Sequence, residues 1–598
     1  MPERHEPKYL YSYANERRRR KRRKILFRRL LALTIVCALV VGGVFIYKGF
    51  FAGGDAASQL AESTTTTIPP LAMTVTAIPS TSPANFDFVT DIFRGGNPLS
   101  TYKRPEGIEF GRGKDYTSLE GIITFRGNNY REGASYGTAS IAVGSLATLW
   151  QVPTGSVTRG SGAGAWTGSG WTGQPLIVRW PEDVKQFMNI YPEKKIDPNL
   201  VEVIYPCLDG KIYFLDLRDG LATRPVIETG GGAIKGTASL YPDGTPMLFV
   251  GQGDNLPGSN PDGVVRVRIY NLIDQSLMYT FGNDDPVAYR KWQAFDASPL
   301  VDAETDTLIQ PGENGILYTV KLNTKFDKAT GLLTIAPEEP IKFRYTARDY
   351  ADGEDNSPTT RWWGMEDSPV AWNNYLYVSD NGGKLMCIDL NTMELVWAQD
   401  IWDDSNSTPL FEESLENGTA YIYISTSLHI TGQGDSQSES GKIPIWKINA
   451  ATGEKVWEST PFHCYSLPGV SGGVEGTGIL GQHDISNLVI YPVARTPSTY
   501  SGLLVALDKN TGQEVWRFEM SNYAWSSPVA VYTPEGKSYI VICDSIGNIF
   551  LLEGATGQLL SSMSTTDKDS PIEASPAVFG NTLVIGTRGQ RIFGIQIQ

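Results

Sequence analysis

The 598-residue sequence has little of the chemistry on which many enzymes depend, since it contains five cysteines and four histidines. No two cysteines are adjacent or spaced Cys-x-x-Cys, the usual pattern of a redox pair or a zinc site. The histidines form no His-Glu-x-x-His, and the glycine-rich segments 160–173 and 230–237 lack the Gly-Lys-Ser/Thr ending of a phosphate loop. We therefore expect no catalytic residues and no metal site, and we favour a binding function over an enzymatic one.

Positive charge is scarce outside the N-terminus. Residues 1–29 hold twelve Lys and Arg against three Asp and Glu, and the chain beyond Lys48 holds 38 basic and 62 acidic residues. Nucleic-acid binding depends on clustered Lys and Arg that neutralise phosphates. We therefore expect no nucleic-acid partner.

The N-terminal 83 residues differ in composition from the rest. A basic cytoplasmic tail (1–29) precedes an uncharged run of 18 residues (30–47), which is just long enough for a transmembrane helix. Positive charge before such a run keeps the N-terminus in the cytoplasm. The Ser/Thr/Pro-rich stretch 48–83 then forms an extended linker. We expect a single-pass cell-membrane protein with its remainder extracytoplasmic; a cleaved secretory signal is the competing interpretation.

A recurring phrase is the most informative feature of the sequence. Its clearest copy is LLVALDKNTGQEVW, which contains Asp508, Gly512 and Trp516. Related copies keep the same eight-residue step to a tryptophan: Asp389 to Trp397 and Asn449 to Trp457. Asp or Asn before Thr-Gly favours a tight turn, because the short side chain bonds the backbone and Gly tolerates positive φ. We expect each tryptophan to bury its ring against a neighbouring repeat.

Ser-Pro dipeptides, or degenerate versions of them, open eight successive groups of strands at intervals of about 40 to 70 residues. They lie at 174–175, 238–239, 298–299, 368–369, 408–409, 477–478, 527–528 and 575–576. Between opener and ending, a Gly turn leads to a period-two strand, as in DGKIYFLD from Asp209. This spacing predicts an all-β protein, an eight-bladed β-propeller of four-stranded antiparallel blades.

The tryptophan phrase resembles a known family repeat. Ala506, Asp508, Thr511, Gly512 and Trp516 match the AxDxxTGxxxW motif of the pyrroloquinoline-quinone (PQQ)-like propellers. That superfamily includes quinoprotein alcohol dehydrogenases and the BamB lipoprotein of outer-membrane assembly. The resemblance covers residues 145–598 and is specific for the fold rather than for an activity. The quinoprotein enzymes usually carry a vicinal disulfide, which this sequence lacks, so we expect no PQQ or calcium cofactor.

The two ends of the propeller are expected to share one blade. The final strands, LVIGTRGQRIFGIQIQ, reach the C-terminus without the tryptophan ending. A strand around Trp150 is available to complete that blade and hide its edge. Residues 84–144 are expected to form a lead-in segment packed on the propeller. In this segment Arg126 and Arg131 are predicted to take part in structural ion pairs, and a ligand-binding role is the alternative.

Residues just before the openers are expected to line the rim of a central funnel. Aromatic rings and carboxylates around one opening suit sugar rings or an extended peptide. The candidate rim residues are Trp171, Trp292, Trp362, Trp363, Glu366, Glu475, Trp525 and Glu573.

These features predict a membrane-anchored extracytoplasmic propeller that acts as a protein-binding or scaffolding module at the cell envelope. One alternative is a protein that binds cell-wall glycan. Another is a PQQ-dependent dehydrogenase, to which the resemblance alone points. The expected partners are envelope proteins or wall glycan.

Overall fold

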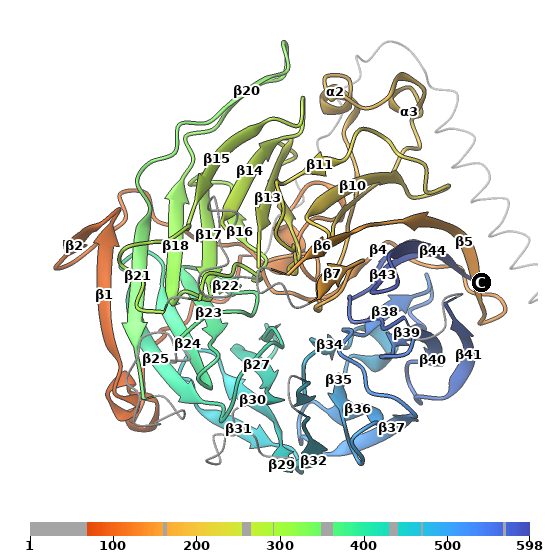
Figure 1. Ribbon diagram of the computed structural model, residues 1–598. Coiled ribbons are helices and arrows are strands. Elements are labelled where there is room, and N and C mark those ends of the chain that lie inside the picture. Colours follow the sequence, from red (N-terminus) through yellow and green to blue (C-terminus); the bar gives the residue numbers. More distant parts are fainter. Residues whose placement is uncertain are drawn as a thin grey trace, which may run out of the picture. The chain divides into compact units, whose positions relative to one another are not determined.

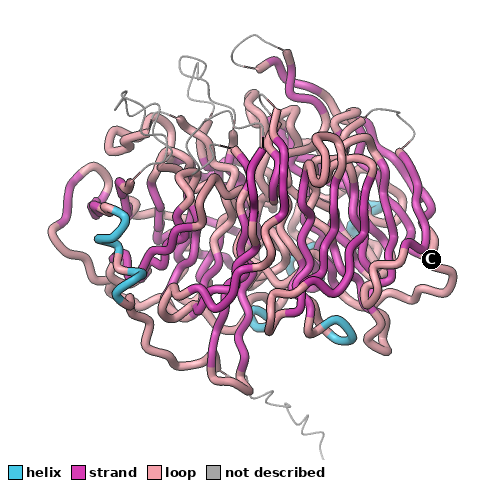
Figure 2. Tube along the Cα trace, turned by 90° about the horizontal axis from the view of Figure 1, so that it is seen from below, coloured by secondary structure: helices cyan, strands magenta, loops and turns pink. Residues whose placement is uncertain are grey.

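The structure is a computed structural model. It describes residues 69–159, 164–253, 265–290, 292–348, 363–429, 440–467, 470–565 and 570–598. The described residues form eight blades arranged around a central axis, as Figure 1 shows, and each blade is built on four antiparallel strands. Further strands extend the sheets of blades 1, 3, 6 and 8. Seen edge-on, the strands run side by side between the two faces of the propeller (Figure 2). The prediction of an all-β, eight-bladed propeller is confirmed.

The blades follow one another in chain order. Blade 1 contains β8 (Leu176–Arg179), β9 (Glu202–Pro206), β10 (Lys211–Asp216) and β11 (Ile227–Glu228). Blade 2 contains β12 (Ser239–Leu240), β13 (Met247–Gly251), β14 (Val267–Asn271) and β15 (Leu277–Phe281). Blade 3 contains β16 (Leu300–Asp302), β17 (Thr307–Gly312), β18 (Ile316–Lys321) and β21 (Ile341–Thr346). Blade 4 contains β22 (Val370–Trp372), β23 (Tyr375–Ser379), β24 (Lys384–Asp389) and β25 (Glu394–Asp400).

The second half of the ring has the same order. Blade 5 contains β26 (Leu410–Ser414), β27 (Thr419–Ser425), β30 (Ile445–Asn449) and β31 (Lys455–Glu458). Blade 6 contains β34 (Ile479–Leu480), β35 (Leu488–Ala494), β36 (Gly502–Asp508) and β37 (Glu514–Met520). Blade 7 contains β38 (Val529–Tyr532), β39 (Ser538–Cys543), β40 (Asn548–Glu553) and β41 (Leu559–Ser564). Blade 8 contains β42 (Ala577–Phe579), β43 (Thr582–Thr587), β44 (Arg591–Ile597) and β5 (Leu146–Pro153).

Further strands and helical turns lie outside the four main strands of each blade. The additional strands are β1 (Val89–Arg94), β2 (Asn97–Leu99), β3 (Glu120–Ile122), β4 (Ser135–Tyr136), β6 (Ser156–Thr158), β7 (Ala165–Thr167), β19 (Lys325–Asp327), β20 (Leu332–Thr334), β28 (Ser427–Leu428), β29 (Ser440–Ile443), β32 (Phe462–Tyr465) and β33 (Gly472–Gly473). The helical turns are α2 (Glu182–Lys185), α3 (Pro192–Lys195), η1 (Pro79–Thr81), η2 (Pro83–Phe86), η3 (Gly113–Asp115) and η5 (His483–Ile485).

The tryptophan of one blade packs on the Thr-Gly turn of the next, which confirms the sequence prediction. Trp457, from blade 5, lies over Gly512 of blade 6, where a Cβ atom would come within 2.7 Å of the ring. The Gly512 φ of +69° suits glycine at this point. The Trp457 indole Nε1 also donates to the Lys509 carbonyl at 3.0 Å. This contact joins two neighbouring sheets through both packing and a hydrogen bond.

The ring closes through its last and first strands, as predicted. Strand β44 pairs antiparallel with β5, and Gly594 lies opposite Trp150. The Trp150 Nε1 then donates to the Leu217 carbonyl of blade 1 at 2.8 Å. The tryptophan contact between blades therefore also crosses the closure point.

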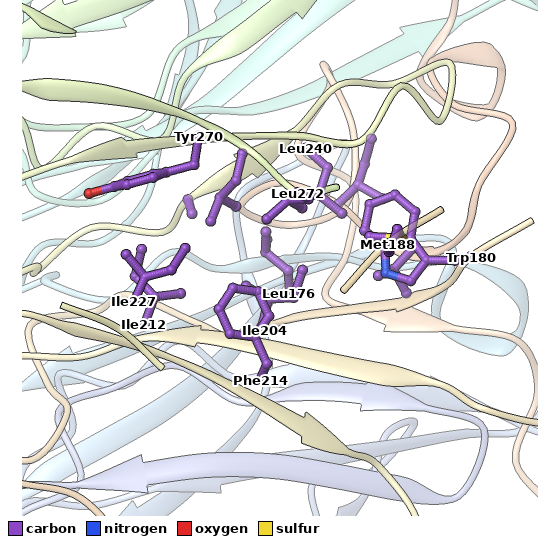
Figure 3. Close-up of a cluster of buried hydrophobic side chains, with 14 of the residues drawn as sticks. Leu176, Trp180, Met188, Ile204, Ile212, Phe214, Ile227, Leu240, Tyr270 and Leu272 are labelled. Carbon is purple, nitrogen blue, oxygen red and sulfur yellow. The ribbon is translucent and has the colours of Figure 1, made fainter. Parts of the chain in front are cut away.

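Hydrophobic clusters fill the spaces between adjacent blades. Figure 3 shows one of them, in which Leu176 and Ile204 of blade 1 meet Leu240 and Leu272 of blade 2. All four are essentially inaccessible to solvent. The described cysteines, Cys207, Cys387, Cys464 and Cys543, are buried free thiols.

Part of the lead-in segment lies against the innermost strands, and we call residues 122–134 the axial plug. Its backbone accepts hydrogen bonds from three separate blades, through the N–H groups of Leu240, Ala371 and Val578. The plug therefore ties together strands that do not touch one another directly.

Among the described residues, Arg126 and Arg131 do not form the predicted ion pairs, and that prediction is wrong. Arg131 donates from Nε to the Pro369 carbonyl at 2.9 Å and from Nη2 to the Ser298 carbonyl at 2.9 Å. Arg126 donates from Nη1 to the Pro528 carbonyl at 3.1 Å. Because the innermost strands present backbone carbonyls to the plug, these oxygens take the place that carboxylates were expected to fill.

Within the described part of the chain, no helix has the length and apolar character needed to cross a membrane. The predicted span 30–47 and the basic tail lie outside the described residues.

Candidate functional site

The loops before the innermost strands and the turns between the two middle strands of each blade meet at one face of the propeller. We call their central meeting point the axial funnel. Trp171, Asp296, Glu366 and Asn406 line a cavity of about 20 Å³ there. This space holds one or two water molecules at most.

Trp171 spans the funnel. It comes from the loop before blade 1, and its Nε1 donates to Glu366 Oε1 at 2.9 Å, in the loop before blade 4. Its ring also lies edge-on to Trp525, from the loop before blade 7, with ring centroids 5.9 Å apart. Lys235 places its Nζ 4.7 Å from the centroid of the Trp171 ring, a distance typical of a cation–π contact. The indole is therefore held by groups from several sides of the axis.

Three carboxylates gather beside this ring. Oxygen atoms of Asp296, Glu313 and Glu366 lie within 4.8 Å of one another. Two cations lie close by: Lys235 Nζ is 3.5 Å from Asp296 Oδ2, and Arg290 Nη1 is 3.9 Å from Glu313 Oε2. Burial, together with the neighbouring Glu366 and Asp296 carboxylates, raises the pKa of Glu313 well above its ordinary value.

One amide links this triad to the buried acid Asp404, and a second amide binds the buried acid Glu475. Asn381 Nδ2 donates to Glu366 Oε2 at 3.0 Å and to Asp404 Oδ1 at 2.9 Å. Asn406 Nδ2 donates to Glu475 Oε2 at 2.7 Å. Burial raises the pKa of Glu475 to about 8, and the Glu366 carboxylate contributes in the same direction. Burial likewise raises the pKa of Asp404, so the funnel is a region where acidic groups resist ionisation.

The predicted rim residues take different positions. Trp171, Glu366, Glu475 and Trp525 meet in the funnel, as the preceding contacts describe. The Glu573 carboxylate lies 3.4 Å from Arg588 Nη1, also at this face.

The other predicted tryptophans do not join the Trp171 cluster through the contacts described. The Trp363 ring packs edge-on against Tyr289, and its Nε1 donates to the Ala347 carbonyl at 3.0 Å. Trp292 is half-buried. Trp362 lies outside the described residues.

Sequence reasoning missed Asp296, Glu313 and Asp404. Asp296 precedes its opener by two residues, so the rule that selected the rim residues could have included it. Glu313 lies in the turn between β17 and β18, a position for which no rule was made. The turns between the middle strands of each blade were the missing signal.

The PQQ-like resemblance implies a quinone with calcium, and the described residues fit these two groups differently. Carboxylate oxygens such as those of Asp296, Glu313 and Glu366 suit a hard divalent cation. A tricyclic quinone does not fit, because the Trp171 ring crosses the funnel and leaves about 20 Å³. We therefore derive no redox step at this site.

Comparison with known proteins gives one family match. Residues 354–461 and 500–598 match the model of the family described as outer membrane protein assembly factor BamB. These stretches contain most of blades 4 to 8. Among curated protein sequences there is no match.

Several solved structures are similar. Quinohemoprotein alcohol dehydrogenase ADHIIG from Pseudomonas putida HK5 is 13% identical over 80% of each chain, with a TM-score of 0.48. The quinohemoprotein alcohol dehydrogenase from Comamonas testosteroni is 12% identical over 80% of each chain, with a TM-score of 0.46. BamB from Moraxella catarrhalis is 15% identical over 75% of this chain and 97% of its own, with a TM-score of 0.40. The chain is thus an eight-bladed β-propeller whose C-terminal part is similar to the BamB family.

Proposed function

We propose that this protein is a membrane-anchored, extracytoplasmic propeller that binds other proteins and acts as a scaffold at the cell envelope. The observation that carries this proposal is the filled funnel. Because Trp171 and its partners occupy the axis, the described residues leave only about 20 Å³ there, and the propeller offers the exposed loops of this face for recognition. The match to a family described by its role in protein assembly supports the same function.

The anchor is the predicted span 30–47, and the twelve Lys and Arg of residues 1–29 that precede it support a cytoplasmic N-terminus and so an extracytoplasmic propeller. Labelling in intact cells tests this topology. Ser521 is exposed in the loop between β37 and β38, whereas the four described native cysteines are buried. We expect a membrane-impermeant maleimide to label Ser521→Cys and to leave the parent chain almost unlabelled. Labelling that appears only after lysis would contradict the proposed topology.

The binding function is tested by photo-crosslinking in intact cells with the full-length chain. One photoreactive residue is placed at Ser521, on the funnel face, and its matched control at Glu535, exposed in the turn between β38 and β39 on the opposite face. We expect a reproducible set of protein adducts, identified by mass spectrometry, at position 521 and few at position 535. Equal adducts at both positions, or none, would oppose a protein-binding funnel face.

Two further measurements test the alternatives, a protein that binds cell-wall glycan and a PQQ-dependent dehydrogenase. A wall-glycan binder would be retained on purified wall material and would lose that retention in Trp363→Ala. A PQQ-dependent dehydrogenase would bind PQQ in the presence of calcium, with quinone absorbance and dye reduction. We expect neither retention nor quinone binding.

A further inference from the structure

A second cavity lies on the face opposite the funnel, between the axial plug and blades 6 and 7. Its volume is about 320 Å³. We call it the Arg126 cavity, and the polar side chains that line it include Lys114, Arg126, Asn128, Glu132, Gln482 and His483. Lys114, Gln482 and His483 are exposed, so the cavity is open to solvent.

Arg126 is a buried cation whose hydrogen bonds are incomplete. Its side chain is 1% exposed, and its Nη1 donates to the Pro528 carbonyl. Its Nε has no hydrogen-bond partner among the described residues, and no described carboxylate pairs with the guanidinium. Although burial lowers the pKa of Arg126 to about 10, the group remains charged at neutral pH. A buried charge without a counter-ion is costly, which favours the binding of an anion beside it.

Arg131 gives an internal comparison, because it is equally buried in the same plug. All three of its side-chain nitrogens donate: Nε to Pro369, Nη2 to Ser298, and Nη1 to the Thr124 hydroxyl at 2.7 Å. The plug can therefore satisfy an arginine completely from its own fold. Arg126 lines a cavity, and its Nε without a partner has no counterpart at Arg131.

The surroundings favour a carboxylate. A guanidinium edge that includes Nε can pair with both oxygens of a planar carboxylate. Lys114 adds positive charge at the cavity opening. Glu132 is the acidic residue in the lining, and its Oε2 accepts from Asn128 Nδ2 at 2.7 Å. Burial raises the pKa of Glu132, which reduces its repulsion of an anion.

We propose that the Arg126 cavity binds a small organic carboxylate, whose carboxylate group pairs with the open edge of the Arg126 guanidinium. This site is independent of the funnel and of the proposed scaffold function.

The test is titration calorimetry of the full-length chain in detergent micelles, with succinate as the probe and inorganic phosphate as the competing anion. Arg126→Gln removes the charge. Gly133→Leu fills the cavity instead, since Gly133 lines it and no atom lies within 4 Å of a Cβ built there. Arg517→Gln is the matched control, because it removes one arginine from an exposed ion pair with Glu514 on blade 6.

We expect succinate to bind the parent chain and Arg517→Gln equally. Binding should weaken roughly tenfold or more in Arg126→Gln and in Gly133→Leu, because a charge-assisted pair or its space is lost. The thermal midpoint without ligand shows whether each variant is folded, and Gly133→Leu decides the question if Arg126→Gln does not fold. Absence of succinate binding to the parent chain, unchanged binding in folded Gly133→Leu, or stronger binding of phosphate than of succinate would each overturn the proposal.

Discussion

The backbone N–H of Ser298 donates a hydrogen bond of 2.9 Å to the hydroxyl of Ser368, 70 residues further along the chain. The same bond, from the opener of one blade to the hydroxyl of the next, recurs around the ring. Further donors are Ser368, Thr408, Thr477 and Ser527, and their acceptors are Thr408, Thr477, Ser527 and Ser575. The Ser or Thr of the opener therefore joins blades side by side, close to the axis.

This arrangement predicts that Ser368→Ala destabilises the folded protein. The substitution leaves the buried Ser298 N–H without its acceptor, so we expect the free energy of unfolding to fall by about 1–3 kcal/mol. Urea unfolding measures the change. Ser407→Ala is the matched control and should be nearly neutral, because the Ser407 hydroxyl is buried and has no partner among the described residues. Equal losses in the two variants would contradict the role given to the Ser298–Ser368 bond.

The tryptophan repeats predict that Trp397→Phe and Trp516→Phe lower the stability of the protein by different amounts. Trp397 Nε1 donates to the Ala450 carbonyl at 3.1 Å, whereas Trp516 Nε1 has no partner among the described residues. Both substitutions remove similar ring area, but only the first removes a hydrogen bond. We expect Trp397→Phe to be more destabilising by about 1 kcal/mol in denaturant unfolding. The reverse order would show that packing alone decides the contribution of these rings.

The Thr-Gly turns predict a steric requirement at Gly512. Alanine there must adopt a φ of +69° and place its Cβ 2.7 Å from the Trp457 ring. At Gly418 the φ is +61°, but no atom lies within 4 Å of a Cβ. Gly418→Ala should therefore cost about 1–2 kcal/mol from backbone strain alone. Gly512→Ala should destabilise the protein clearly more than Gly418→Ala does, as measured by thermal unfolding. Equal losses of stability in the two variants would argue against close packing of the Trp457 ring on Gly512.

The raised pKa of Glu475 predicts a pH dependence of stability. Its pKa is about 8 in the folded protein and about 4.5 when exposed, so the folded state binds the extra proton between these values. The stability it contributes is complete below about pH 4.5 and is lost as the pH rises toward and through 8.

Comparison with Glu475→Gln isolates this effect, since the amide keeps an acceptor for Asn406 and cannot ionise. We expect the variant to match the parent chain near pH 5 and to become increasingly more stable than the parent toward pH 8, by thermal unfolding. A difference that does not change with pH would mean that Glu475 ionises normally in the folded protein.

The sequence was most informative where structure depends on short segments. The openers and the Asp508-to-Trp516 repeat are local patterns, and each maps directly onto a strand boundary or a turn. The funnel acids could not be predicted in this way, because Asp296, Glu313 and Glu366 approach one another only after separate loops and turns have been placed. The ion-pair prediction for Arg126 and Arg131 failed for the same reason, since nothing near them in sequence indicates that distant carbonyls surround them.

The pairing of β44 with β5 also constrains the order in which the protein can fold. Contacts between residues so far apart in sequence form slowly, because a long loop must close before any stabilisation is gained. During synthesis, β5 leaves the ribosome long before its partner and remains an unpaired edge until the last strand emerges. An incomplete chain would thus expose the unpaired edge of β5, which can pair with other chains and aggregate. A chaperone that covers this edge would be most useful before β44 pairs with it.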